Sequence, residues 1–95
     1  MSTSPAPTTR TKVLLVDDHD LIRKGLRHAF ERDRQFEVVG EAATAAEAVR
    51  QAGALQPDVV IMDLRLPDGS GLEATRALRT NSSTRGIVVL TMYAG

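Results

Sequence analysis

The chain has 95 residues, 42% of them hydrophobic and 25% charged, which is typical of one small globular domain. Twelve basic and twelve acidic residues cancel, so no net charge attracts nucleic acid or an anionic membrane. The absence of cysteine excludes disulfides, thiolate chemistry and cysteine metal sites, and it favours a cytoplasmic setting. No apolar run is long enough to span a bilayer.

The chain begins with a polar tail that leads into a strand and a helix. Residues 1–11 are rich in Ser, Thr and Pro and predict a disordered tail. The apolar run Val13–Val16 predicts a buried strand, and Asp18 is placed to cap the helix that follows. The apolar face of this helix consists of Leu21, Ile22, Leu26, Ala29 and Phe30. Its charged face, which we expect to be solvated, consists of Arg23, Lys24, Arg27, Glu31 and Arg32.

The middle of the chain predicts a second strand and a second helix. Residues 36–40 alternate partly between apolar and polar side chains, as expected for a half-exposed strand at a sheet edge. Thr44–Glu47 matches a capping box and opens the second helix, which Pro57 ends.

The last third repeats the same alternation. Val59–Met62 predicts a buried strand, and the loop Leu64–Gly69 contains a Pro-Asp-Gly turn. Ser70–Glu73 matches another capping box and opens a third helix. Ile87–Leu90 predicts a fourth strand. The order β-α-β-α-β-α-β predicts an α/β fold, a doubly wound parallel sheet with helices on both faces.

Acidic residues follow two of the predicted buried strands. Asp17 and Asp18 follow the first strand and Asp63 follows the third. If residues 36–40 form the edge, these two strands are neighbours, and their carboxyl ends meet where the strand order reverses. Clustered carboxylates need a counter-cation, and Mg²⁺ binds through carboxylates, waters and phosphate oxygens. Asp63, between the acidic pair and Thr91, is then the candidate nucleophile for an aspartyl phosphate.

Each of these residues also has a plainer interpretation. Asp18 alone is typical of a helix cap, Asp63 of a strand end before a turn, and Thr91 of any strand. Their joint placement at neighbouring strand ends favours a site. His19 and His28 are predicted to be solvated helix residues, because nothing beside them has the spacing of metal ligands.

Three segments resemble a known family. VLLVDDHDLIRKGL, DVVIMDLRLPDGSG and IVVLTMYAG are similar to the receiver domain of two-component response regulators, over residues 12–95. The DDH opening, the FEVVGEA strand, the LPDGSG loop and the LTM ending resemble the subfamily with a LuxR-type helix-turn-helix output domain. The resemblance implies a flavodoxin-like fold with strand order 2-1-3-4-5, of which 2-1-3-4 is present here.

The resemblance also implies roles for individual residues. It implies phosphoryl transfer from a sensor histidine kinase to Asp63. It implies Mg²⁺ ligation by Asp18, Asp63 and the Arg65 backbone carbonyl, with Asp17 assisting through water. Thr91 matches the switch hydroxyl that reorients toward the phosphoryl group. The domain is expected to be cytoplasmic, with no membrane partner, and to reach DNA only through an output domain.

The chain departs from the family pattern at its C-terminal end. The family's lysine at the end of a fifth strand has no counterpart, since the chain's lysines are Lys12 and Lys24. The fourth helix, the fifth strand, the last helix and an output domain are also missing. Ile87–Leu90 would then be an open apolar edge, which is a pairing hazard. We therefore expect residues 12–95 to be a receiver domain truncated at its C-terminal end, or one that forms a homodimer through this strand.

Three other functions share features with this pattern. A haloacid-dehalogenase-like phosphatase needs a second Asp two residues after the nucleophile, where Arg65 stands. A flavin- or nucleotide-binding module needs a phosphate loop after the first strand, and the acidic run Asp17–Asp20 repels phosphate. A short interaction or decoy module that is not phosphorylated stays open on the sequence alone.

Overall fold

Four parallel strands form the main sheet, in the order β2-β1-β3-β6. The computed structural model describes residues 10–63, 65–67, 69–81 and 86–90. The strands of the main sheet are β1 (Thr11–Val16), β2 (Phe36–Ala42), β3 (Val59–Asp63) and β6 (Gly86–Leu90). This order confirms the predicted 2-1-3-4 arrangement, with the half-exposed β2 at an edge.

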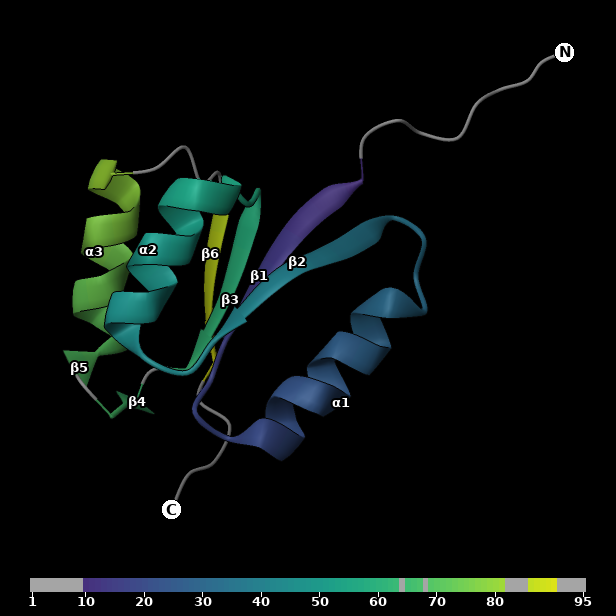
Figure 1. The fold of residues 1–95 in the computed structure, drawn as a ribbon, viewed down its shortest axis with the longest axis horizontal. Coiled ribbons are helices and arrows are strands. Elements are labelled where there is room, and N and C mark those ends of the chain that lie inside the picture. The colour runs from purple at the N-terminus through teal and green to yellow at the C-terminus, as the bar shows by residue number, and fades with distance from the viewer. Residues whose placement is uncertain (1–9, 64, 68, 82–85, 91–95) are drawn as a thin grey trace, which may run out of the picture.

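Helices cover both faces of the sheet. Figure 1 shows α2 (Ala45–Leu55) and α3 (Gly71–Asn81) together on one face and α1 (Asp20–Glu31) on the other. Right-handed crossovers between parallel strands place consecutive helices on the two faces when the strand order reverses. The doubly wound architecture predicted from the element order, and the flavodoxin-like fold implied by the resemblance, are therefore confirmed. Within the described residues, no helix is both long and apolar enough to cross a membrane.

Strand alternation divides the core into two clusters. In β1, Leu14 and Val16 point toward α2 and α3, whereas Val13 and Leu15 lie on the face covered by α1. The cluster under α2 and α3 consists of Leu14, Val16, Ala42, Ala48, Ala52, Val60, Met62, Leu66, Ala74 and Leu78. The cluster on the α1 face consists of Val13, Leu15, Val38 and Ile61, with Leu26, Phe30, Phe36 and Val59 packed against it.

A register shift brings β2 close to α2. Val13 pairs with Val38, but Leu14 pairs with Gly40, so β2 carries one extra residue there. A Cβ atom on Gly40 would lie 2.5 Å from the side-chain oxygen of Gln51 and 2.8 Å from Leu55 Cδ1. Gln51 in turn donates a hydrogen bond to the Glu41 carbonyl at 2.7 Å. Glycine at position 40 is therefore what lets helix and strand approach this closely.

The observed starts of the helices agree only in part with those predicted from the sequence. The second helix begins as predicted, because the Thr44 side chain accepts from the Glu47 backbone N–H at 3.1 Å and the Glu47 carboxylate accepts from the Ala43 N–H at 2.9 Å. The predicted Asp18 cap of α1 is wrong. The N-cap is His19, and it makes no side-chain capping bond. Asp18 stays in the loop beside the other acidic residues.

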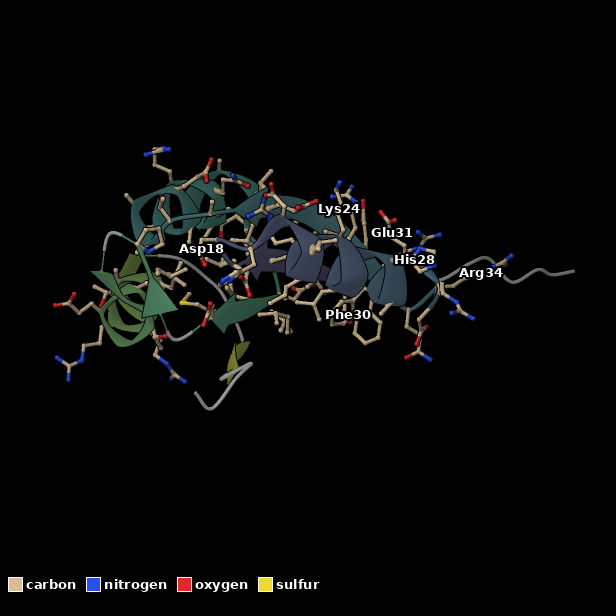
Figure 2. All side chains as sticks on the ribbon, turned by 90° about the horizontal axis from the view of Figure 1, so that it is seen from below. Asp18, Lys24, His28, Phe30, Glu31 and Arg34 are labelled. Atoms are coloured by element: carbon tan, nitrogen blue, oxygen red, sulfur yellow. The ribbon has the colours of Figure 1, made fainter. Side chains whose placement is uncertain are left out.

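The apolar face of α1 is less buried than predicted. No residue of this helix is fully buried, and Leu21 is 82% exposed. Phe30 does pack inward, with its ring edge-on to that of Phe36 at a centroid distance of 5.1 Å. Figure 2 shows Phe30 on the opposite side of α1 from Lys24 and Glu31.

The loop after β3 holds a small hairpin, where the sequence predicted a turn alone. Two antiparallel strands, β4 (Arg65–Leu66) and β5 (Gly69–Ser70), pair directly before α3. Leu66 is buried in the cluster under α2 and α3. Pro67 follows β4 directly, and residue 68 of the predicted turn lies outside the described residues.

Candidate functional site

The sheet register places two of the predicted site residues side by side. Val16 of β1 pairs with Met62 of β3, so the next residues along, Asp17 and Asp63, reach the same level at the carboxyl ends of neighbouring strands. β1 and β3 also flank the point where the strand order reverses. The fold therefore brings Asp17 and Asp63 to the edge of the sheet where open α/β folds bind ligands.

Four side chains converge there. One potential ligand atom from each of Asp17, Asp18, His19 and Asp63 lies within 4.8 Å of all the others. The predicted gathering of the three carboxylates is confirmed. His19 was not predicted to take part. The signal that the sequence offered was the position of His19 directly after the acidic pair.

The two neighbouring carboxylates have different environments. The Asp17 side chain is 3% exposed, and its Oδ1 accepts from the His19 backbone N–H at 2.8 Å and lies 2.9 Å from His19 Nδ1. The Asp17 backbone N–H donates to the Ala42 carbonyl of β2 at 3.0 Å. The Asp18 side chain is 37% exposed, with its Oδ1 3.0 Å from the same His19 nitrogen. Asp17 is thus held inside the loop, while Asp18 is open to a ligand from solvent.

The His19 ring responds to this negative charge. The hydrogen bond to Asp17, followed by the charge of Asp18, raises the pKa of His19 above its ordinary value. When it is protonated, the ring supplies a positive charge beside carboxylates that otherwise repel one another.

The site suits a hard divalent cation. Carboxylate oxygens are the ligands that Mg²⁺ takes, at bond lengths of ~2.1 Å. Oxygens that belong to one cation of this size are at most ~4.2 Å apart, so the 4.8 Å span needs only small side-chain movements to close. Asp63 is half-buried and Asp18 exposed, which leaves room for the waters that Mg²⁺ retains.

A basic side chain lies closer to this site than predicted. Arg23 was expected on a solvated face, but its side chain is only 16% exposed. It donates to the Asp17 backbone carbonyl and to the Asp20 carboxylate, and it pairs with Glu41 of β2 at 3.0 Å. The helical periodicity of α1 indicated a polar face, but it held no information that β2 lies against part of it.

Other predicted residues lie beyond what the structure describes in full. Arg65 belongs to β4, two residues after Asp63, so its backbone is close in sequence to the cluster. Thr91 lies outside the described residues.

The comparisons with known proteins agree with this geometry. The family described as "Response regulator receiver domain" matches residues 13–95. The chain is 44% identical over 82 residues to the DNA-binding transcriptional activator DevR/DosR of Mycobacterium tuberculosis, and 43% identical over 82 residues to the transcriptional regulatory protein LiaR of Bacillus subtilis. These matches cover 86% of this chain but only 38% and 39% of those proteins.

Solved structures show the same fold. A LuxR-family two-component response regulator from Aurantimonas sp. SI85-9A1 superposes with a TM-score of 0.82 at 42% identity, covering 92% of this chain and 62% of that one. The receiver domain of CheB from Thermotoga maritima superposes with a TM-score of 0.81 at 33% identity, covering 92% and 66%. The sequence match, the strand order and the acidic cluster at the strand ends agree, and the chain belongs to the response regulator receiver domain family.

Proposed function

We propose that Asp63 accepts a phosphoryl group from a phosphohistidine of a sensor kinase. The observation that carries this proposal is the convergence of Asp17, Asp18 and Asp63 at the carboxyl ends of neighbouring strands. Receiver domains are signalling domains rather than classical enzymes, so the chemistry is limited to the domain's own phosphorylation and dephosphorylation. Asp63 ends a central strand, and its half-buried position keeps the carboxylate accessible.

The acidic residues also hold the cation that the transfer requires. Asp18 and Asp63 would bind Mg²⁺ directly with the Arg65 carbonyl, and Asp17 would act through a water. Bound there, the ion offsets the repulsion between the carboxylates and an incoming phosphoryl group. The buried Asp17 carboxylate, tied to the His19 backbone N–H, keeps the loop in shape while Asp18 faces solvent.

The phosphoryl transfer needs no reactant other than the phosphohistidine and the Asp63 carboxylate. An oxygen of the Asp63 carboxylate forms the new bond to phosphorus, while the bond from phosphorus to the kinase histidine nitrogen breaks and the imidazole leaves. Water later attacks the acyl phosphate and releases inorganic phosphate. We assign the Thr91 hydroxyl to the phosphoryl group as the switch that reports its presence to the rest of the domain.

The names of the relatives support a proposal for the role of the whole protein. The chain spans less than half the length of DevR/DosR and LiaR, both named as transcriptional regulators. We infer that phosphorylation of the domain, acting as a homodimer in the cytoplasm, controls transcription through a DNA-binding output domain outside this chain. The 95 residues themselves contain no recognisable DNA-binding motif.

Replacing the phosphoacceptor is the decisive experiment. Full-length wild-type protein should be labelled by acetyl phosphate and bind beryllofluoride in the presence of Mg²⁺, whereas Asp63→Asn should do neither. Asp58→Asn is the matched control, because Asp58 lies just before β3 at its other end, where its carboxylate accepts from the Lys12 backbone N–H at 2.9 Å. Labelling of Asp63→Asn at the wild-type level would move the acceptor elsewhere. A wild type that takes no label would favour the unphosphorylated interaction module.

The cation site has a separate test. Mg²⁺ titration of Asp18→Ala, followed through backbone amide shifts, should show at least a tenfold loss of affinity because a direct ligand is gone. Asp58→Ala removes a carboxylate at the other end of β3, outside the four-residue cluster, and should change the affinity little. Unchanged affinity in Asp18→Ala would place the cation at other residues.

A further inference from the structure

We propose that Arg23 is a positioning residue for the cation site, acting through the peptide that joins Asp17 to Asp18. This inference rests on the proposed function, since it concerns how tightly the acidic cluster binds Mg²⁺. Arg23 lies on α1, one turn into the helix, and its side chain is largely covered. Its guanidinium binds the backbone carbonyl of Asp17, directly before the proposed ligand Asp18, so we propose that its effect passes through the backbone.

The Arg23 guanidinium joins three elements. One terminal nitrogen donates to the Asp17 backbone carbonyl, the other donates to the Asp20 carboxylate, and Nε donates to Glu41 Oε1 at 3.0 Å. The Asp17 residue is therefore held from both sides, because its N–H also donates to the Ala42 carbonyl next to Glu41 in β2 at 3.0 Å. The end of β1 is thus fixed between the C-terminal end of β2 and the first turn of α1.

Fixing that carbonyl also fixes the start of Asp18. The Asp17 carbonyl and the Asp18 N–H belong to one planar peptide, so holding the first also holds the Asp18 N–H and Cα, from which the Asp18 side chain leaves the backbone. The Asp18 side chain is 37% exposed, against 3% for Asp17, so burial restrains it less. A ligand that is already oriented loses less conformational freedom when it binds a metal, and groups that orient metal ligands commonly contribute 10- to 100-fold in affinity.

The sign of the effect separates positioning from simple charge. A positive guanidinium beside the cluster repels Mg²⁺, so its charge alone weakens cation binding. Removal of that charge would tighten the Mg²⁺ complex. Removal of the hydrogen bond to the Asp17 carbonyl would loosen it. The two accounts therefore predict opposite changes in the same variant.

Arg27 provides a matched control. It lies one turn further along α1, carries the same charge, and binds the same Glu41 carboxylate through the other oxygen, Oε2. Its second partner is Glu31 at 3.0 Å, not the Asp17 carbonyl. Arg27→Gln therefore removes a charge and a bond to Glu41 while it leaves the end of β1 held.

The experiment compares Mg²⁺ affinity in full-length protein for Arg23→Gln, Arg23→Lys and Arg27→Gln, by amide shifts and calorimetry. We expect about a tenfold loss in Arg23→Gln and a change below about twofold in Arg27→Gln. Arg23→Lys should lose Mg²⁺ affinity to a similar extent as Arg23→Gln, because a single lysine ammonium cannot bind all three acceptors that the planar guanidinium binds. Without Mg²⁺, ¹⁵N relaxation should show added microsecond-to-millisecond exchange at Asp18 and His19 in both Arg23 variants.

The outcomes divide clearly. Unchanged or tighter binding in Arg23→Gln overturns the proposal, as does an equal loss in Arg27→Gln, which would indicate a general effect of the α1 surface. If Arg23→Gln does not fold, Arg23→Lys decides by the same criterion. A wild type that binds no Mg²⁺ overturns the proposed cation site and this inference together. Normal wild-type binding with insensitive Arg23 variants removes the inference alone.

Discussion

The two faces of the sheet are held by different forces. Under α2 and α3, ten buried apolar residues form one continuous cluster, and both Ala48 and Ala52 of α2 are fully buried. On the other face, the described core has four buried residues, and α1 contributes none that is fully buried. What α1 has instead is a set of ion pairs to β2, centred on Glu41.

This difference separates stability from the geometry of the site. Apolar burial contributes roughly 25 cal/mol per Å² and needs no particular orientation, so among the described residues the larger cluster under α2 and α3 contributes more hydrophobic stabilisation than the cluster on the α1 face. The charged contacts of α1 are directional and individually weak. They act on the loop that carries Asp17 and Asp18, where direction matters more than strength.

The largest expected effect is loss of a side chain from the α2/α3 face. Leu14→Ala should lower the free energy of unfolding by about 2–5 kcal/mol, because Leu14 is fully buried in the larger cluster and its removal leaves a cavity. Leu21→Ala is the matched change on α1, where 82% exposure predicts an effect below about 0.5 kcal/mol. Urea denaturation measures both. Equal losses would mean that the two faces are not held differently.

The next effect tests the close approach of β2 and α2. Gly40→Ala should cost about 1–3 kcal/mol, since the new methyl group must displace Gln51 and Leu55. Gly25→Ala on α1 meets nothing within 4 Å and should instead stabilise by up to about 1 kcal/mol, through helix propensity. Thermal unfolding of the two variants should shift in opposite directions. A stabilised Gly40→Ala would show that the α2 side chains move aside at no cost.

A smaller effect concerns the ion pairs around Glu41. Glu41→Gln removes the charge that binds both Arg23 and Arg27, and it should cost about 1 kcal/mol at low salt. Salt screens such pairs, so the difference from wild type should shrink in 1 M NaCl. The Leu14→Ala difference should keep its size under the same conditions. A salt-independent Glu41→Gln effect would indicate packing rather than charge.

The smallest effect is the pH dependence of the His19 contact. The pKa of His19 is raised by the hydrogen bond to Asp17 and the charge of Asp18, so protonation favours the folded state. That contribution is complete below the unfolded value of about 6.5 and is lost as pH rises through the raised folded pKa. Without divalent cations, the stability of wild type relative to His19→Asn should therefore decline slightly between pH 5.5 and pH 8.5. A pH-independent difference would show that folding does not shift the pKa of His19.

Much of the fold follows from local patterns. The apolar runs at Val13–Val16 and Val59–Met62 and the capping box at Thr44–Glu47 define their elements through side-chain period and hydrogen-bonding chemistry alone. The handedness of parallel crossovers then leaves few topologies, which is why the acids that follow neighbouring strands were expected to meet. These rules left a few strand orders, and the half-exposed pattern of residues 36–40 together with the family resemblance indicated the order that the sheet shows.

The details around α1 could not be obtained in this way. Periodicity indicates which residues share a face of a helix, but it does not say how far that face is covered, so Leu21 was placed inward and Arg23 outward. The same limit applies to the α1 cap, because His19 takes the N-cap position predicted for Asp18 and also joins the acidic cluster.

The sequence alone determined the alternation of strands and helices, the parallel sheet and the acidic strand ends, since each depends on neighbours within a few residues and on general rules of chain handedness. The distance from α1 to β2, the burial of Arg23 and the turn of His19 into the cluster were decided only in three dimensions. They depend on contacts between residues such as Arg23 and Glu41, 18 positions apart, whose geometry is set by how the helix packs on the sheet.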